Sequence, residues 1–452
     1  QPDGFRFQLK DRSGAVLAPA HAQAGLKLNG SKVVRVQAGA AQGTFTVTSA
    51  AGLDAQVQIR IENDRVMLTV DPLQPGWHTV DLSLAGMPVA YGLGDVGGWS
   101  GRLNLVTDKA VRYPLKIDGG GQRWQTTFVV FPDNDLAGVV FGGKQPAVVL
   151  GPDAYTMTVK TNKAVSFHYL SGDMPTIYGS YKRLLIENGF PWIKPKSRFF
   201  ELGWESWAAL GYQTRDATVL QSIADFQDMG YPIRWAVTGS GFWEEGGTTT
   251  SFGRYGSKFA DPAAFKAKLH SMDVKWLIGL RTNFVLPGGP HVPKSKERDR
   301  NLKGNFFNGN PLSSDGVAHD YFVKNASGDL VVQTSPWFPI VPCYLLDGTK
   351  PEAVDWYVDL YKRWGVDGVK EDTMMNVGSD HLEIFNAPIA RLAKEEALVM
   401  ARCGSFSAPG TLLRINDTKV DDMRLRTPVN YWHYAASGAP NVYSDTVGFG
   451  KM

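Results

Sequence analysis

The spacing of hydrophobic and polar residues changes near residue 172, which divides the chain into two parts. In the first part, short segments alternate apolar and polar positions, which is the period of a strand that buries one face. The alternating segments cover residues 33–37, 44–47, 56–61 and 66–70. Residues 128–131 and 137–141 are continuously apolar and suit the space between two packed sheets. We therefore predict an antiparallel β-sandwich over residues 1–172.

The second part alternates strand-like segments with segments of helical spacing, after a helical linker predicted over residues 173–196. The predicted strands cover residues 199–204, 233–237, 276–280, 366–370, 398–400, 412–415 and 441–443. The predicted helices cover residues 217–229, 262–272, 353–364 and 388–396. Strands that alternate with helices form parallel sheets, and this many favour a (β/α)8 TIM barrel. We predict such a barrel over residues 197–452 and expect it to be truncated after its seventh strand.

One long segment of the predicted barrel carries no extended periodic pattern. Residues 283–345 follow the third predicted strand and are rich in Gly, Pro and Asn. Loops of this length inside a compact domain usually have a functional role. We therefore expect this insertion to form a lid or a rim over the barrel.

Composition and charge exclude several classes of function. The net charge of +3 is small and spread along the chain, which argues against a nucleic-acid partner. The basic run at residues 294–300 is expected to be a solvated loop. No apolar run is long enough to span a membrane. The aromatic content of 12% fits a sugar site, because aromatic rings stack on the C–H faces of sugars, but it fits any large core as well.

The cysteines and the first residue bear on compartment and cofactors. Cys343 and Cys403 can form at most one disulfide, and their positions do not resemble a metal site. We expect neither a metal nor another cofactor. The chain begins at Gln1, as an exported chain does after removal of a signal peptide, so a secreted or periplasmic location is expected.

Two carboxylates follow predicted barrel strands, at the end where barrel enzymes hold their catalytic residues. Asp372 follows the fourth strand and Asp417 follows the sixth. Such a pair can flank a sugar, so that one carboxylate attacks the anomeric carbon and the other protonates the leaving oxygen. Lys370 shares a strand face with Asp372, and its charge would keep that carboxylate ionised. Taken alone, Asp372 is somewhat more often an acidic loop residue or a helix N-cap.

Further polar and aromatic residues follow the other predicted strands, where they could hold sugar hydroxyls or orient a carboxylate. The candidates for substrate binding are Glu205 and Trp207 after the first strand, Trp243 and Glu244 after the second, Arg281 after the third, Arg402 after the fifth and Asp445 after the seventh. For any one of them a structural ion pair is an equal alternative. Their convergence at one end of one barrel favours a binding site.

The order of several motifs resembles glycoside hydrolase family 31. Residues 365–372 (GVDGVKED) resemble the family's nucleophile strand, and residues 416–417 (ND) resemble the segment with the acid/base. Residues 401–404 (ARCG) resemble the "SRSG" segment, and residues 443–449 (YSDTVGF) resemble "SDIGGF". Residues 259–262 (FADP) resemble "FPDP". In the predicted sandwich, residues 91–95 (YGLGD) resemble a family segment whose loop reaches the active site, which adds Asp95 to the candidates.

The resemblance implies an exo-acting, retaining α-glycoside hydrolase that needs no cofactor. Asp372 would be the nucleophile and Asp417 the acid/base, and the partner would be an α-linked oligosaccharide or glycoside. Two segments depart from the common α-glucosidases: residues 241–247 read GFWEEGG, and residues 372–375 read DTMM. These departures favour an α-galactosidase-type member. An α-glucosidase, an α-xylosidase or a transglycosylase of the same family are the alternatives.

Two other classes of protein remain open. An inverting carbohydrate enzyme could use Glu244 and Glu245 instead of the two aspartates. A non-catalytic pseudoenzyme could bind a sugar at the same rim without turnover. The presence of Asp at both catalytic positions argues against the pseudoenzyme.

Overall fold

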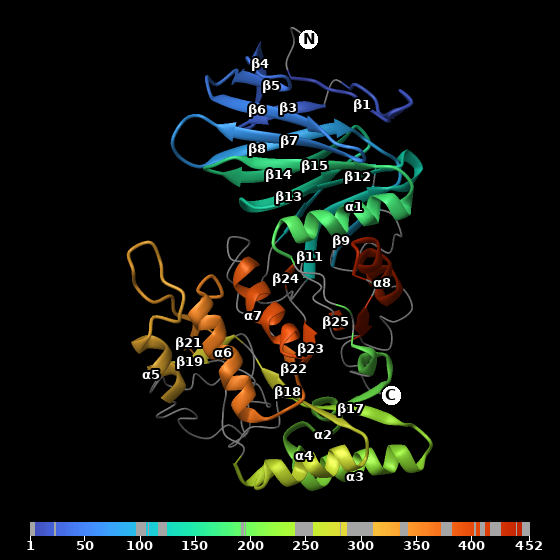
Figure 1. Cartoon of the computed structure of the whole chain (residues 1–452), viewed down its shortest axis with the longest axis vertical. Coiled ribbons are helices and arrows are strands. Elements are labelled where there is room, and N and C mark those ends of the chain that lie inside the picture. Colours follow the sequence, from blue (N-terminus) through green and yellow to red (C-terminus); the bar gives the residue numbers. More distant parts are fainter. Residues whose placement is uncertain are drawn as a thin grey trace.

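A computed structural model describes most of the chain. The described residues are 5–21, 24–95, 105–106, 108–115, 124–190, 194, 196–239, 256–280, 282–286, 311–334, 342–371, 382–401, 404–406, 412–415, 426–439 and 441–444. They form an N-terminal β domain and a C-terminal α/β domain, which follow one another along the long axis of the molecule (Figure 1).

The N-terminal domain is a large sheet that is antiparallel throughout, apart from one short strand contributed by the barrel domain. Its strands are β3 (Gly25–Leu28), β4 (Ser31–Ala38), β5 (Thr44–Ser49), β6 (Asp54–Ile61), β7 (Arg65–Pro72), β8 (His78–Ala85), β9 (Tyr91–Gly94), β10 (Val111–Pro114), β11 (Trp124–Phe131), β12 (Leu136–Val140), β13 (Lys144–Leu150), β14 (Ala154–Thr161) and β15 (Val165–Ser171). A separate two-stranded sheet joins β1 (Leu9–Lys10) and β2 (Val16–Ala18). The N-terminal part of the chain is therefore rich in β-strands, as expected, while its assignment as a β-sandwich stays a prediction.

The sheet has two halves, and β4 pairs with strands of both, β3 and β5. Leu82 and Met157 from one half share a buried cluster with Val57, Leu68 and Phe167 from the other. Each such side chain stabilises the fold by roughly 1.5–3 kcal/mol when it leaves water. The alternation seen in the sequence therefore arises because every second residue of these strands enters this common core.

Helix α1 (Met174–Glu187) follows the sheet and leads toward the barrel. It begins after Asp173, whose side chain accepts a hydrogen bond from the Thr176 amide at 2.9 Å and so caps the helix. Its Tyr181 ring stacks on Phe128 of β11 with ring centroids 3.9 Å apart. The helix is thus packed firmly against the N-terminal sheet.

The C-terminal domain is built on a parallel sheet whose spatial order follows the sequence. Its strands are β16 (Leu202–Glu205), β17 (Ile233–Thr238), β18 (Lys275–Leu280), β22 (Gly368–Glu371), β23 (Leu398–Ala401), β25 (Leu412–Ile415) and β26 (Val442–Ser444). The helices of this domain are α2 (Ser206–Leu210), α3 (Asp216–Asp228), α4 (Pro262–Ser271), α5 (Pro311–Ala318), α6 (Pro351–Trp364), α7 (Leu382–Lys394) and α8 (Arg426–Ala436). This is the arrangement of a TIM barrel, as predicted, while truncation after the seventh strand stays a prediction.

Three details differ from the elements expected from sequence. The first barrel strand begins at Leu202, because residues Ser197–Phe200 form a 3-10 helix that buries Phe199 and leaves Phe200 exposed. Helix α7 begins before Pro388, which was expected to mark its start and lies inside it. The insertion contains α5 and a small antiparallel sheet of β19 (Asn283–Val285), β20 (Gln333–Thr334) and β21 (Pro342–Leu345).

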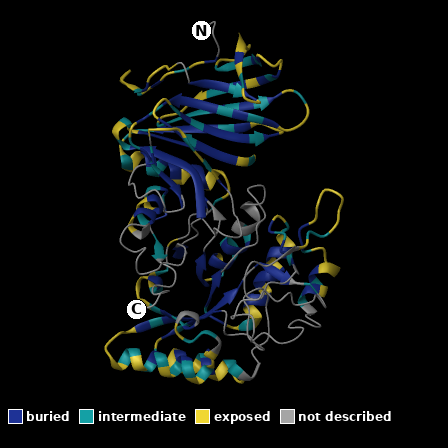
Figure 2. Cartoon of the chain, turned by 180° about the vertical axis from the view of Figure 1, so that it is seen from behind, coloured by how far each residue is buried: buried dark blue, intermediate teal, exposed yellow. Residues whose placement is uncertain are grey.

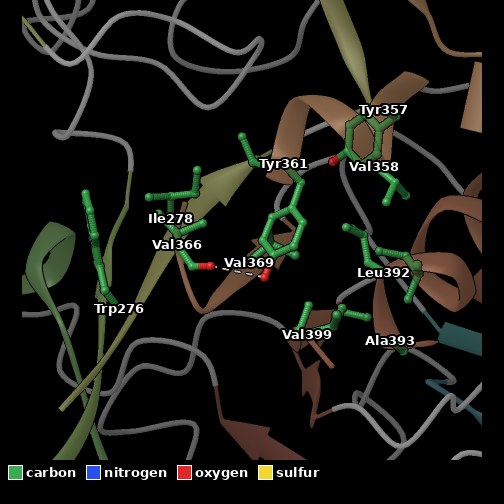
Figure 3. Close-up of a cluster of buried hydrophobic side chains, with 14 of the residues drawn as sticks. Trp276, Ile278, Tyr357, Val358, Tyr361, Val366, Val369, Leu392, Ala393 and Val399 are labelled. Atoms are coloured by element: carbon green, nitrogen blue, oxygen red, sulfur yellow. Dashed lines mark hydrogen bonds between the residues drawn. The ribbon is translucent and has the colours of Figure 1, made fainter. Parts of the chain in front are cut away.

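Successive residues of each barrel strand enter different cores. Ile278, Val369 and Val399 belong to an outer cluster that includes residues of α6 and α7, among them Tyr357 and Leu392 (Figure 3). Their strand neighbours Leu277, Leu398 and Met400 belong to a separate inner cluster, together with Trp235 and Leu412. The inner face of each strand therefore points into the barrel, which decides which polar residues can meet there.

Asp367, which directly precedes β22, forms hydrogen bonds with residues near the amino ends of β18 and β23. Its Oδ2 accepts hydrogen bonds from the Trp276 amide and from His270 Nε2, both at 2.8 Å. Its own amide donates to the Trp276 carbonyl at 2.9 Å, and its carbonyl accepts from the Leu398 amide at 3.0 Å. One residue thus links β18, β22 and β23.

Replacement of Asp367 by Asn should lower the free energy of unfolding by about 2 kcal/mol, because hydrogen bonds to a charged carboxylate lose strength. Urea denaturation measures this change. Asp359→Asn, on the exposed side of α6, is the control and should change stability by less than about 0.5 kcal/mol. Equal stability of the two variants would contradict the assigned role of Asp367.

His168 is a buried imidazole on β15. Its ring lies against Phe141 with centroids 5.9 Å apart, and its Nδ1 finds no hydrogen-bond partner in the described part of the chain. Burial, reinforced by the charge of Arg65, lowers the pKa of His168 to about 4. The folded protein therefore holds this ring neutral at pH values where the unfolded chain protonates it.

The pH dependence of stability follows from this pKa. Between pH 6.5 and pH 4 the unfolded state binds more protons at His168, so stability is fully present above this range and falls as the pH falls through it. The loss attributable to His168 is at most about 3 kcal/mol. In His168→Phe, unfolding monitored from pH 7 to pH 4 should show a shallower slope. A slope equal to that of the parent chain would refute the assignment.

Candidate active site

Lys370 and Glu205 form a buried ion pair inside the barrel. Lys370 Nζ donates to Glu205 Oε1, and the side chains are 6% and 7% exposed. Glu205 is the last residue of β16 and Lys370 lies next to the end of β22, with β17 and β18 between these strands. The pair therefore spans the barrel interior at the carboxyl ends of the strands, where catalytic sites of barrels lie.

Glu371 and Arg414 form a second polar contact near the same strand ends. Glu371 lies on the outer face of β22, where its charge adds to burial in raising the pKa of Tyr357 on α6 above the usual range. Its carbonyl accepts a hydrogen bond from Arg414 Nη1 at 2.9 Å, and Arg414 is 1% exposed. Arg414 alternates with Leu413 of the outer cluster, so it shares the inner face of β25 with Leu412. A buried guanidinium therefore holds the main chain at the end of β22.

Asp95 lies at the junction of the two domains. It follows β9, it is 1% exposed, and its amide donates to the Trp124 carbonyl at 2.9 Å. The preceding Gly94 amide donates to Ser437 Oγ, which follows α8 of the barrel domain, at 2.7 Å. Asp95 therefore belongs to the N-terminal domain but is anchored to the barrel domain.

The other predicted site residues are placed only in part. Trp207 lies in α2, directly after β16, and its main chain alone is described. The predicted catalytic pair, Asp372 and Asp417, lies outside the described residues. The candidates Trp243, Glu244, Arg281, Arg402 and Asp445 lie outside them as well.

Sequence reasoning did not single out Arg414, and it did not pair Glu205 with Lys370. Arg414 could have been found from the period of two on β25, since it occupies the same face as the apolar Leu412. A charged residue on an inner strand face needs a partner, because burial of an unpaired charge is costly. The partner itself could not be found in this way, since β16 and β22 are far apart in the sequence.

Among the described residues, no group of three or more His, Cys, Asp and Glu side chains is placed to hold a metal ion. Within the same part of the chain, no helix is sufficiently long and apolar to cross a membrane.

A cavity of about 560 Å³ lies on the outside of the barrel between α4 and α6. Its lining includes Lys266, His270, Trp276 and Trp364. Trp276 is near the amino end of β18, so this cavity lies away from the strand ends that carry Glu205 and Lys370. It contains none of the candidate residues.

Part of the barrel domain is similar to a known protein family. Residues 199–398 match the model of the "Glycosyl hydrolases family 31 TIM-barrel domain". No curated protein sequence matches the chain significantly.

Several solved structures share the fold. A GH31 family sulfoquinovosidase from E. rectale aligns with a TM-score of 0.67 and 12% identity over 100% of this chain and 74% of its own. A GH31 dextranase from Flavobacterium johnsoniae aligns with 0.63 and 13% over 93% and 54%. A GH31 α-xylosidase from a soil metagenome aligns with 0.63 and 12% over 95% and 72%. The chain thus spans only about half of the dextranase.

Replacement of Glu205 by Leu should destabilise the protein by about 3 kcal/mol or more, because it leaves the Lys370 ammonium buried without its carboxylate. The double variant Glu205→Leu with Lys370→Met should regain much of this loss, since it removes both charges. Chemical denaturation of the purified variants measures both effects.

A surface pair supplies the control for this experiment. Asp355 is paired with Arg391 at 3.3 Å and its side chain is 62% exposed. Asp355→Leu should therefore change stability by no more than about 1 kcal/mol. If Glu205→Leu were as mild as Asp355→Leu, the Lys370–Glu205 pair would not be the buried interaction described above.

Proposed function

We propose that the chain is a retaining α-glycoside hydrolase of glycoside hydrolase family 31, because residues 199–398 match the model of that family's TIM-barrel domain. The observation that carries the proposal is the inward orientation of Lys370, at the end of β22 where the barrel interior becomes polar. The proposed nucleophile Asp372 follows Lys370 by two residues in the sequence.

The proposed reaction has two displacements at the anomeric carbon. Asp417 donates a proton to the glycosidic oxygen while Asp372 attacks, so the bond to the leaving group breaks as the glycosyl-aspartate bond forms. Asp417 then takes a proton from water, whose oxygen displaces Asp372 and releases the sugar with its α configuration. No step requires a metal or an organic cofactor.

The ion pair has a consequence for the nucleophile. Lys370 by itself would favour the ionised form of a nearby carboxylate, as a nucleophile requires. Glu205 neutralises much of that charge, since the two side chains are in contact. We infer that Lys370 mainly holds Glu205 in place at the carboxyl ends of the strands. Its electrostatic effect on the pKa of Asp372 would then be weaker than that of an unpaired ammonium.

The sugar is a separate question, with two candidates. The α-galactoside expected from sequence rests on departures at residues 241–247 and 372–375, which would fit another unusual sugar equally well. A sulfonated α-glycoside is favoured by the similarity to the sulfoquinovosidase, which extends over all of this chain. We therefore place the sulfoquinovoside first and the galactoside second.

Initial rates on aryl α-sulfoquinovoside, α-galactoside, α-glucoside and α-xyloside test both levels of the proposal. We expect turnover of the sulfoquinovoside, and a loss in Asp372→Ala of at least about 10³-fold, because the covalent intermediate cannot form. Asp359→Asn, on the exposed side of α6, should retain the parent rate.

The outcomes separate the mechanism from the substrate. Turnover of another α-glycoside that disappears in Asp372→Ala keeps the mechanism and refutes the sulfoquinovoside. Activity that survives in Asp372→Ala would refute the nucleophile and favour a pair such as Glu244 and Glu245. Binding of a sugar without turnover by the parent chain would favour the pseudoenzyme.

A further inference from the structure

Strand β11 extends from the N-terminal domain toward the barrel domain (Figure 1), and its first two residues are Trp124 and Gln125. The short strand β24 (Gly404–Ser405) runs parallel to them, with Trp124 opposite Gly404 and Gln125 opposite Ser405. β24 begins three residues after β23 ends at Ala401, so it lies just beyond the carboxyl end of a barrel strand. A strand of the N-terminal domain therefore reaches the face of the barrel at which catalysis is proposed.

The same two residues hold the main chain of Asp95 from both sides. The Asp95 amide donates to the Trp124 carbonyl at 2.9 Å, and the Asp95 carbonyl accepts from Gln125 Nε2 at 2.9 Å. Gln125 also lies opposite Gly94 in the pairing of β11 with β9. Figure 2 shows that β11 is buried along its length, and Gln125 is 8% exposed. The Gln125 amide is therefore sheltered from water, where a hydrogen bond is strong and its loss is costly.

Helix α8 and the residue after it also contact Trp124 and Gly94. The Trp124 ring stacks on Tyr434 with centroids 5.5 Å apart, and Ser437 Oγ joins the Gly94 amide to the His433 carbonyl. Gly94 is required for this close approach, because its φ is +70° and a Cβ there would lie 2.5 Å from the Trp124 carbonyl oxygen. β9, β24 and α8 are thus joined through two residues of β11.

From this geometry we propose that Gln125 is a positioning residue for the sugar-binding site. Its side-chain amide holds the carbonyl of Asp95 in place. Its main chain lies opposite Ser405 in the pairing of β11 with β24. The inference rests on the proposed function, because it takes Asp95 as a contact to the substrate. Small displacements of groups that contact a substrate lower the rate strongly, so a residue that never touches the sugar can control its binding.

Gln125→Met tests the proposal, because Met has a similar length and shape but lacks the amide donor. We expect kcat/KM to fall roughly 10- to 100-fold, with a larger change in KM than in kcat. Hydrogen–deuterium exchange should become faster in peptides that cover residues 91–95 and 404–406. Thermal unfolding of each variant shows whether it is folded under the assay conditions.

Thr127→Val is the matched control, on the same strand two residues further along. Thr127 is also fully buried, and its Oγ1 donates to the Val140 carbonyl at 2.6 Å, within the N-terminal domain. Thr127 Oγ1 also accepts a hydrogen bond from the Val140 amide at 3.0 Å, so the variant loses two buried hydrogen bonds. We nevertheless expect kcat/KM to stay within about twofold of the parent and exchange at the junction to be unchanged, because both bonds lie within the N-terminal domain.

Each outcome decides the proposal. Unchanged kcat/KM and unchanged exchange in Gln125→Met would overturn it, and so would equal losses in Gln125→Met and Thr127→Val, which indicate a general effect on stability. If the parent chain turns over none of the four aryl glycosides, the proposed function fails. The exchange of residues 91–95 and 404–406 then decides by itself whether Gln125 holds the junction.

Discussion

The alternation of side chains about parallel strands is the constraint from which the rest of this structure follows. Ile278, Val369 and Val399 point outward and are covered by helices, whereas Leu277, Met400 and Leu412 point inward and fill the barrel. The helices can pack only if the outward set is apolar, and the barrel interior can close only if the inward set fits together. Polar residues on the inward faces are then restricted to the strand ends.

The inward polar residues at these ends are strongly coupled. Lys370 is joined to Glu205 across the barrel, and Arg414 bonds the carbonyl of Glu371. Both contacts are buried, so each charge depends on its partner for the solvation that water would otherwise supply. The end of β22 is consequently held by side chains from β16 and β25, and this rigidity is what the proposed nucleophile at Asp372 would require.

The N-terminal domain contributes directly to the same region. Its strand β11 pairs with β24 of the barrel domain, and its residue Gly94 is bonded to Ser437 after α8. Asp95, which follows Gly94, is thereby held at the barrel domain although it belongs to the other domain. The junction is polar and buried, so loss of one hydrogen bond there affects the position of its neighbours as well as stability.

The sequence by itself determined the class of each domain, the order of the barrel strands and the face on which Lys370 lies, because these follow from local periods of two and of about 3.6 residues. It placed the first barrel strand too early, since Phe199 and Phe200 are equally apolar and tertiary packing buries only Phe199. Only the tertiary structure decided that Glu205 meets Lys370, that Arg414 supports β22 and that Gln125 joins Asp95 to β24. Each of these contacts joins residues that are distant in the sequence, and no local pattern records which distant residue the folded chain brings near.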